Sequence, residues 1–190
     1  MHKVIKILIS ASLFYNFAGG LFGPIYAIFV EKIGGDILTA SSAIALYNII
    51  IGILILTFSR IEDRINKRNV VVLGYFLSAI GVTGYLFVSQ PWHLFVVQTI
   101  LSFGAITNPA WDALFAASTD KRKESEEWGL WEGSIKINAG IAALIGGFIA
   151  SFLGFRTLFV LMSASTFASA FASTLLLRKK TWKGFLNLKI

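Results

Sequence analysis

The chain alternates long apolar stretches with short polar connections, and six of the stretches are long enough to cross a membrane. A helix needs about 20 residues to span roughly 30 Å of hydrocarbon. The predicted spans are Ile7–Val30, Ile37–Phe58, Val70–Ser89, Trp92–Ser118, Trp128–Leu153 and Phe155–Leu177. We therefore expect an all-α membrane protein in which residues 1–177 form a six-helix transmembrane bundle within the lipid bilayer.

Composition supports a membrane protein and excludes several kinds of site. The chain is 56% hydrophobic and 14% charged, whereas soluble domains are about a quarter charged. The absence of cysteine excludes disulfides and thiolate metal or redox sites. The spans contain no His or carboxylate cluster with metal-ligand spacing. We therefore expect no catalytic residues, no metal and no cofactor, and we do not expect an enzyme.

Lysine and arginine predict the orientation of the spans. Fourteen of the seventeen basic residues lie on one side, in the N-terminus, the second-to-third and fourth-to-fifth connections and the C-terminal tail. The other side carries only Lys32 and Arg156, and Lys136 lies within the fifth span. The positive-inside rule then places both termini in the cytoplasm. The charge of +7 therefore indicates a multi-pass protein of the cell (inner or plasma) membrane, with no nucleic-acid partner.

Residues 178–190 form a separate basic segment after the last span. They alternate lysines with apolar residues such as Trp182 and Phe185. This pattern predicts a basic amphipathic cytoplasmic tail lying on the inner leaflet.

Polar side chains within the spans are unevenly distributed. Amide and ionisable groups are costly in hydrocarbon and usually face a protein interior or a water-filled cavity. They occur in spans one, two, four and five, as Asn16, Asn48, Gln98, Asn108, Asp112, Glu132, Lys136 and Asn138. These four spans, with Tyr26 as an aromatic candidate, are predicted to line a polar site, and spans three and six to be outer supports.

Asp112, Glu132 and Lys136 are predicted to lie at a similar depth, one to two turns above the inner surface. The fourth span runs inward and the fifth runs outward, so their inner ends are close. An ion pair of Lys136 with Asp112 or Glu132 is one interpretation, and a role in handling a substrate or a proton is another. The two are compatible.

Two further patterns concern the helix backbones. Gly23-Pro24 falls late in the first span and Asn108-Pro109 late in the fourth. These breaks fall at opposite sides of the membrane, as expected for two inverted three-helix repeats. In the fifth span Gly140, Ala143 and Gly147 form a stripe of small residues, which allows close helix packing within the bundle or against a second bundle.

The connection between spans two and three carries a motif. It reads Ser59-Arg60-Ile61-Glu62-Asp63-Arg64-Ile65-Asn66-Lys67-Arg68. Its location and its Asp63, Arg64, Lys67 and Arg68 resemble the G-x-L-x-D-R-x-G-R-R signature of the major facilitator superfamily. Over essentially its whole length, the chain looks like the N-terminal six-helix half of such a transporter.

The chain departs from the family pattern at several positions. Ser59 and Asn66 replace the two glycines of the signature. Among the other residues, asparagine best tolerates a left-handed backbone, so the turn could survive this replacement. Gln98 replaces an arginine of the fourth span. Of an antiporter pattern in the fifth span, the pair Gly146-Gly147 is kept while a Gly-Pro is lost.

The resemblance implies alternating access around a site faced by spans one, two, four and five. It also implies that the charged connection is a conformational latch, with Asp63 at a helix N-terminus of an opposite bundle. Arg64 or Arg68 would pair with Asp120 or Asp112. The simpler interpretation of these charges is a positive-inside anchor.

The family has two such bundles, whereas this chain has one. We therefore predict a half-size secondary transporter of a small-molecule solute, working as a parallel homodimer or with a separately encoded second-half protein. The alternative is a truncated or non-transporting membrane protein with an assembly or regulatory role.

Overall fold

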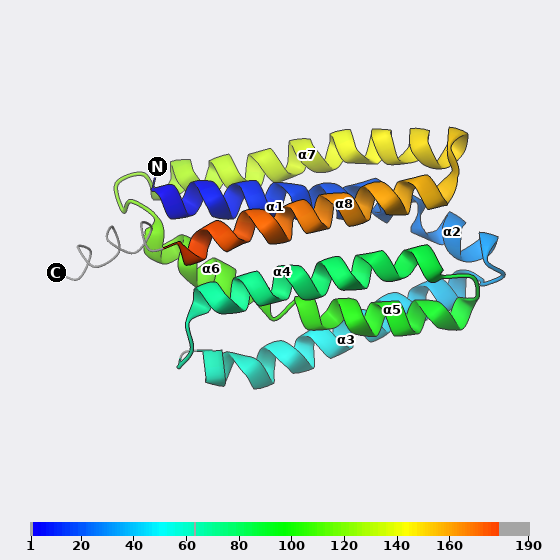
Figure 1. Ribbon diagram of the computed structural model, residues 1–190, viewed down its shortest axis with the longest axis horizontal. Coiled ribbons are helices and arrows are strands. Elements are labelled where there is room, and N and C mark those ends of the chain that lie inside the picture. The colour runs from blue at the N-terminus through cyan, green and yellow to red at the C-terminus, as the bar shows by residue number, and fades with distance from the viewer. Residues whose placement is uncertain (1, 63, 179–190) are drawn as a thin grey trace.

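A computed structural model describes residues 2–62 and 64–178, and it confirms the predicted all-α class (Figure 1). Six helical segments of the described chain are long and apolar enough to cross a membrane. The elements are α1 (Lys3–Phe22), η1 (Gly23–Ile25), α2 (Tyr26–Lys32), α3 (Ile37–Glu62), α4 (Lys67–Gly84), η2 (Tyr85–Phe87), α5 (Pro91–Gly104), α6 (Thr107–Ser118), α7 (Glu124–Phe152), α8 (Gly154–Thr174) and η3 (Leu175–Leu177). The predicted tail lies outside the described residues, apart from Arg178.

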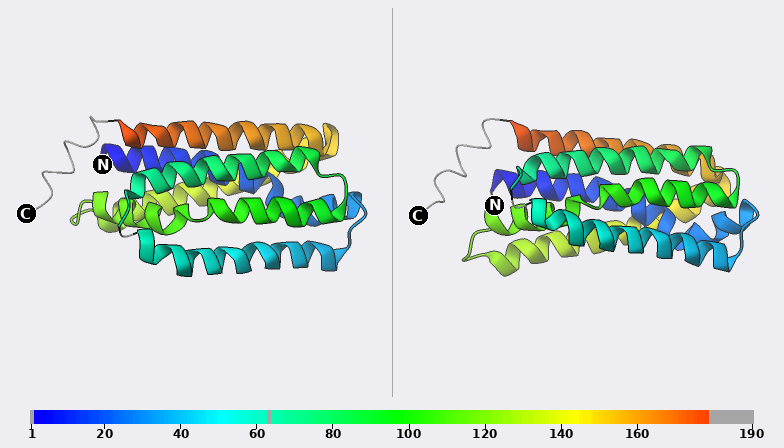
Figure 2. Two further views of the ribbon diagram at one scale, coloured as in Figure 1. Left: turned by 60° about the horizontal axis from the view of Figure 1, so that its bottom comes forward. Right: turned by 90° about the horizontal axis from the view of Figure 1, so that it is seen from below.

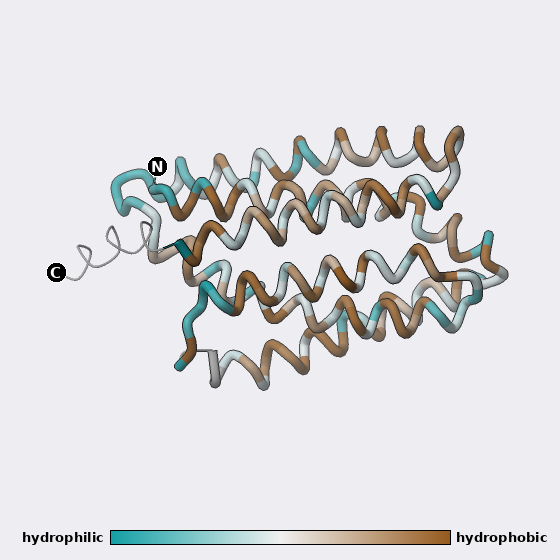
Figure 3. Tube along the Cα trace, in the orientation of Figure 1, coloured by the Kyte–Doolittle hydropathy of each residue, from teal (hydrophilic) through white to brown (hydrophobic). Residues whose placement is uncertain are grey.

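The helices run side by side along the long axis of the molecule (Figures 1 and 2). The main contacts form a series in which α7 packs on α1, α1 on α8, α8 on α4, α4 on α5 and α5 on α3. The two ends of the described chain lie at the same end of the bundle, called here the N-terminal end (Figure 1). Apolar residues follow the helices, and hydrophilic residues gather in the connections (Figure 3).

The first and fourth spans are broken. The first changes to a 3-10 turn at Gly23–Ile25 before α2, and the fourth is interrupted at residues 105–106, between α5 and α6. Pro24 and Pro109 lie at these breaks. A proline lacks the backbone N–H that continues a helix, which explains why the helices are interrupted there. The short helix α2 lies at one end of the bundle and α6 at the other (Figure 1), as the sequence suggested.

Side-chain caps fix where two helices begin. The Asp36 carboxylate accepts hydrogen bonds from the Thr39 hydroxyl (2.6 Å) and backbone N–H (2.7 Å) at the start of α3. These bonds lower the pKa of Asp36. Asn66 caps α4 by accepting from the Arg68 N–H at 3.0 Å. Its φ of −72° is extended, so Asn66 does not use the left-handed backbone that asparagine tolerates.

Small residues and hydroxyls hold the helices together. A Cβ at Gly146 of α7 would overlap the backbone of Leu21 in α1. On the other side of α1, Ser165 and Ser169 of α8 donate to the carbonyls of Phe14 (2.8 Å) and Ala11 (2.6 Å). Such interhelical bonds stabilise membrane bundles by about 0.6 kcal/mol each. Helix α1 is thus tightly held between α7 and α8.

Burial is distributed unevenly among the six spans. Only 6% of the most apolar part of α3 and 11% of that of α7 is buried, against at least 44% in each of the other spans. Helices α3 and α7 stand at the two ends of the packing series. Spans three and six, predicted as outer supports, correspond to α4 and α8, which pack against each other near the middle of this series.

We predict that Gly146→Leu destabilises the bundle, because the added side chain must displace the α1 backbone. Overpacking of this kind costs about 1–3 kcal/mol. Gly133→Leu is the matched control, since nothing lies within 4 Å of a Cβ there. Unfolding in a mild detergent, followed by circular dichroism, measures the difference. Equal midpoints for the two variants would contradict the packing of α7 on α1.

Candidate functional site

A cavity of about 530 Å³ opens among five of the six spans. Every span except the last contributes to it. Its lining residues are Ser12, Tyr15, Asn16, Tyr47, Tyr75, Ser78, Gly104, Ala105, Thr107, Asn108, Trp111, Asp112, Trp131, Glu132, Ile135 and Lys136. The volume lies in the range of small-molecule sites.

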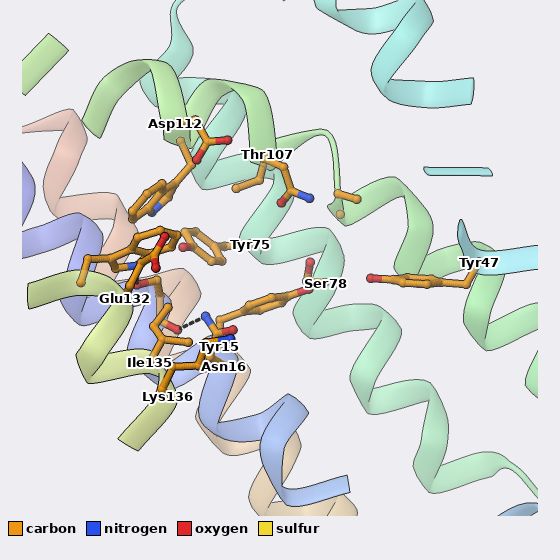
Figure 4. Close-up of a pocket in the computed structure, with 16 residues that line it drawn as sticks. Tyr15, Asn16, Tyr47, Tyr75, Ser78, Thr107, Asp112, Glu132, Ile135 and Lys136 are labelled. Atoms are coloured by element: carbon orange, nitrogen blue, oxygen red, sulfur yellow. Dashed lines mark hydrogen bonds between the residues drawn. The ribbon is translucent and has the colours of Figure 1, made fainter. Parts of the chain in front are cut away.

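Five of the predicted polar residues meet in this cavity. Asn16 comes from α1, Asp112 from α6, and Glu132 and Lys136 from α7 (Figure 4). Asn108 also comes from α6. Asp112 lies six residues before the end of α6 and Glu132 eight residues after the start of α7. These separations correspond to about 9 and 12 Å along the helices, so the two carboxylates lie at a similar depth.

The three ionisable groups of the cavity are not paired with one another. Among the described residues, Lys136 forms no ion pair with Asp112 or Glu132, so the predicted pair is absent. All three side chains are exposed in the described chain. The charges therefore face the cavity without a direct partner.

The other predicted cavity residues lie elsewhere. Gln98 donates to the Tyr26 hydroxyl at 3.3 Å, and both side chains are buried. This bond joins α5 to α2. Asn48 donates to the Ile44 carbonyl of its own helix at 2.9 Å. Asn138 donates to the Leu13 carbonyl of α1 at 2.8 Å, beside a separate, mostly apolar groove between α1, α7 and α8.

Sequence reasoning missed the contribution of span three. Tyr75 and Ser78 of α4 line the cavity, and the Tyr75 ring packs edge-on against Tyr15 at 5.7 Å between centroids. In Figure 4 the hydroxyls of Tyr15 and Tyr47 point toward each other near Ser78. The i,i+3 spacing of Tyr75 and Ser78 places both on one helix face, but hydroxyl groups are also common in ordinary packing.

Trp111 and Trp131 form the aromatic wall of the cavity. Their rings lie 4.6 Å apart, and Trp131 donates to the Ser12 hydroxyl at 3.2 Å. Trp111 is only 4% exposed. Its Nε1–H lies near the Tyr75 hydroxyl but makes no well-formed hydrogen bond with a described residue.

The predicted latch residues that the structure describes have different surroundings. Asp63 lies outside the described residues. Arg68 is 5% exposed and donates to the Leu176 carbonyl at 3.1 Å, joining the start of α4 to η3, which directly follows α8. Arg64 is exposed, and Lys67 is the first residue of α4.

Asp120, the proposed acidic partner, has local contacts. Its carboxylate accepts from the Arg122 N–H at 3.0 Å, and its own N–H donates to the Glu127 carboxylate at 3.2 Å. These contacts order the connection between α6 and α7, in place of the predicted pairing with Arg64 or Arg68.

The sequence as a whole matches one family. Residues 8–187 match the Major Facilitator Superfamily. The chain belongs to this superfamily of transporters. The match covers the broken first and fourth spans and the helices that line the cavity.

Its relatives within the superfamily differ in length. The chain is 23% identical to the uncharacterized MFS-type transporter YitZ of Bacillus subtilis over 80% of its own length and 94% of that relative. It is 24% identical to the multidrug resistance protein MdtG of Dickeya zeae, over 95% of this chain but 45% of MdtG. It is 26% identical to the MFS-type transporter MJ1560 of Methanocaldococcus jannaschii, over 83% of this chain and 38% of that protein. The chain thus spans less than half of MdtG and MJ1560.

We predict that Arg68→Met destabilises the junction of α4 and α8, because a buried carbonyl loses a charged donor. Hydrogen bonds to charged groups contribute about 1.5–3 kcal/mol. Arg64→Met removes the same charge at an exposed position and serves as the control. Hydrogen exchange of the α8 amides should increase in the first variant only. Equal exchange in both variants would contradict the Arg68–Leu176 contact.

Proposed function

We propose that this chain is a half-size secondary transporter that moves a small solute by alternating access. It would work as a parallel dimer or with a separately encoded second half. We place both termini in the cytoplasm, which makes the N-terminal end of the bundle its inner side.

The observation that carries this proposal is an uncovered polar cavity between two uncovered helices. Tyr47 of α3 and Glu132 of α7 both line the cavity and lie on opposite sides of it in Figure 4, and α3 and α7 have no substantial contact with each other among the described residues. Charged side chains open to lipid are costly. A second bundle laid across α3 and α7 would cover the cavity and place it at the centre of the assembly.

One face of α7 supports the same arrangement. Glu132, Lys136, Gly140, Ala143 and Gly147 follow one another at spacings of three or four residues, so they form one stripe along the helix. Its inner part lines the cavity. Nothing lies within 4 Å of a Cβ at Gly140 or Gly147 in its outer part, where a second bundle could approach closely. Contact there would close the outer end and leave the cavity open toward the cytoplasm.

The contacts between spans support two inverted three-helix repeats. In such repeats spans one, two and three correspond to spans four, five and six. The contact of α1 with α7 then corresponds to the contact of α5 with α3. The contact of α1 with α8 corresponds to the contact of α5 with α4. The matched breaks of the first and fourth spans fit the same correspondence. Such repeats give a bundle that can rock as a unit.

We predict that a cysteine at Asn108 reacts with a membrane-impermeant thiol reagent from either side of sealed vesicles, because alternating access exposes the cavity to both. The natural chain has no cysteine, so single-cysteine labelling has no background. Lys121→Cys should label only from the inside and Gln90→Cys only from the outside. Labelling of Asn108→Cys from one side under every condition would favour an assembly or regulatory role over transport.

We predict that Gly147→Leu weakens association through α7 without unfolding the chain, because the stripe loses its close approach. Crosslinking in native membranes and mass in a mild detergent measure association. Ala164→Leu is the matched control, since it enlarges an exposed small residue on α8. If the two variants associate equally well, the contact runs through another face.

A further inference from the structure

We propose that the cavity selects an organic cation, namely a protonated amine carried on an apolar or aromatic body. The inference deepens the proposed function and rests on it for the passage of this cation across the membrane. Binding of the cation can be measured separately from its passage.

The charges of the lining residues favour a cation. Asp112 and Glu132 bring two carboxylates, while Lys136 brings one ammonium group, and no ion pair joins them among the described residues. The lining therefore has a formal charge of −1 with these side chains ionised. A bound monocation neutralises it, whereas an anion would add to the excess of negative charge in a site of reduced dielectric.

The aromatic residues favour the same class of solute. Five of the sixteen lining side chains are aromatic, namely Tyr15, Tyr47, Tyr75, Trp111 and Trp131. Tryptophan and tyrosine rings attract cations within about 6 Å of their faces, and they also pack well against an apolar body. Trp111 directly precedes Asp112 on α6 and Trp131 directly precedes Glu132 on α7, so each acidic residue of the lining follows an aromatic one.

One polar group of the lining could orient the solute. Asn16 donates its amide N–H to the Ser12 carbonyl at 2.8 Å, which leaves its own carbonyl oxygen to accept from an ammonium group.

The test compares four probes of similar shape on the full chain in lipid nanodiscs. They are 2-phenylethylamine, which is cationic at neutral pH, 2-phenylethanol, 3-phenylpropionate and the zwitterion phenylalanine. Titration calorimetry measures their affinities. We expect the amine to bind about tenfold or more tightly than each of the others. Equal affinity for the alcohol, tighter binding of the anion or zwitterion, or no binding of the amine overturns the inference.

Charge variants separate a direct electrostatic role from a structural one. Glu132→Gln should weaken binding of the amine by about tenfold, and Lys136→Gln should strengthen it several-fold by removing a like charge. Glu126→Gln, an exposed position of α7 outside the cavity, should leave it unchanged. Weaker binding of the amine by Lys136→Gln, with the melting temperature of the protein unchanged, would contradict the proposed class of solute.

Binding and transport fail in different ways. Tight, charge-selective binding of the amine with Asn108→Cys labelled from one side only would support the inference and contradict transport. Two-sided labelling with preferential binding of the anion would support transport and overturn the inference.

Discussion

The structure depends on the cost of placing charge at membrane depth. Asp112, Glu132 and Lys136 lie within spans that are otherwise strongly apolar. Such side chains must face protein or water, which fixes the rotation of α6 and α7 about their axes. The cavity is the result of that constraint, because each helix that meets it contributes polar or aromatic atoms toward the same space.

Two sets of helix surfaces surround the charged residues, one packed within the bundle and one exposed on its open side. Within the bundle, α1 is held by Gly146 of α7 on one side and by Ser165 and Ser169 of α8 on the other. Across the open side, α3 and α7 carry long exposed apolar side chains, such as Leu56 and Leu144. The first set of contacts makes one rigid half, and the second leaves a surface suited to lipid or to another bundle.

The sequence predicted the parts of this fold that composition and periodicity determine. Six spans follow from apolar length, and the broken spans follow from Pro24 and Pro109. The meeting of Asp112 with Glu132 and Lys136 follows from opposite helix directions. The sequence could not predict which polar residues form hydrogen bonds within the bundle, because Gln98 and Asn138 carry the same amide groups as residues that line the cavity. Their partners, the Tyr26 hydroxyl and the Leu13 carbonyl, become adjacent only through tertiary packing.

The bond between Gln98 and Tyr26 has a consequence for the two halves of the proposed route through the bundle. It is a neutral pair in the half farther from the N-terminal end, whereas the three ionisable residues of the cavity lie nearer to that end. A charged solute moving past the neutral half would leave its countercharges behind. The proposed route is therefore electrostatically asymmetric, and the larger cost of carrying a charge falls in this neutral half.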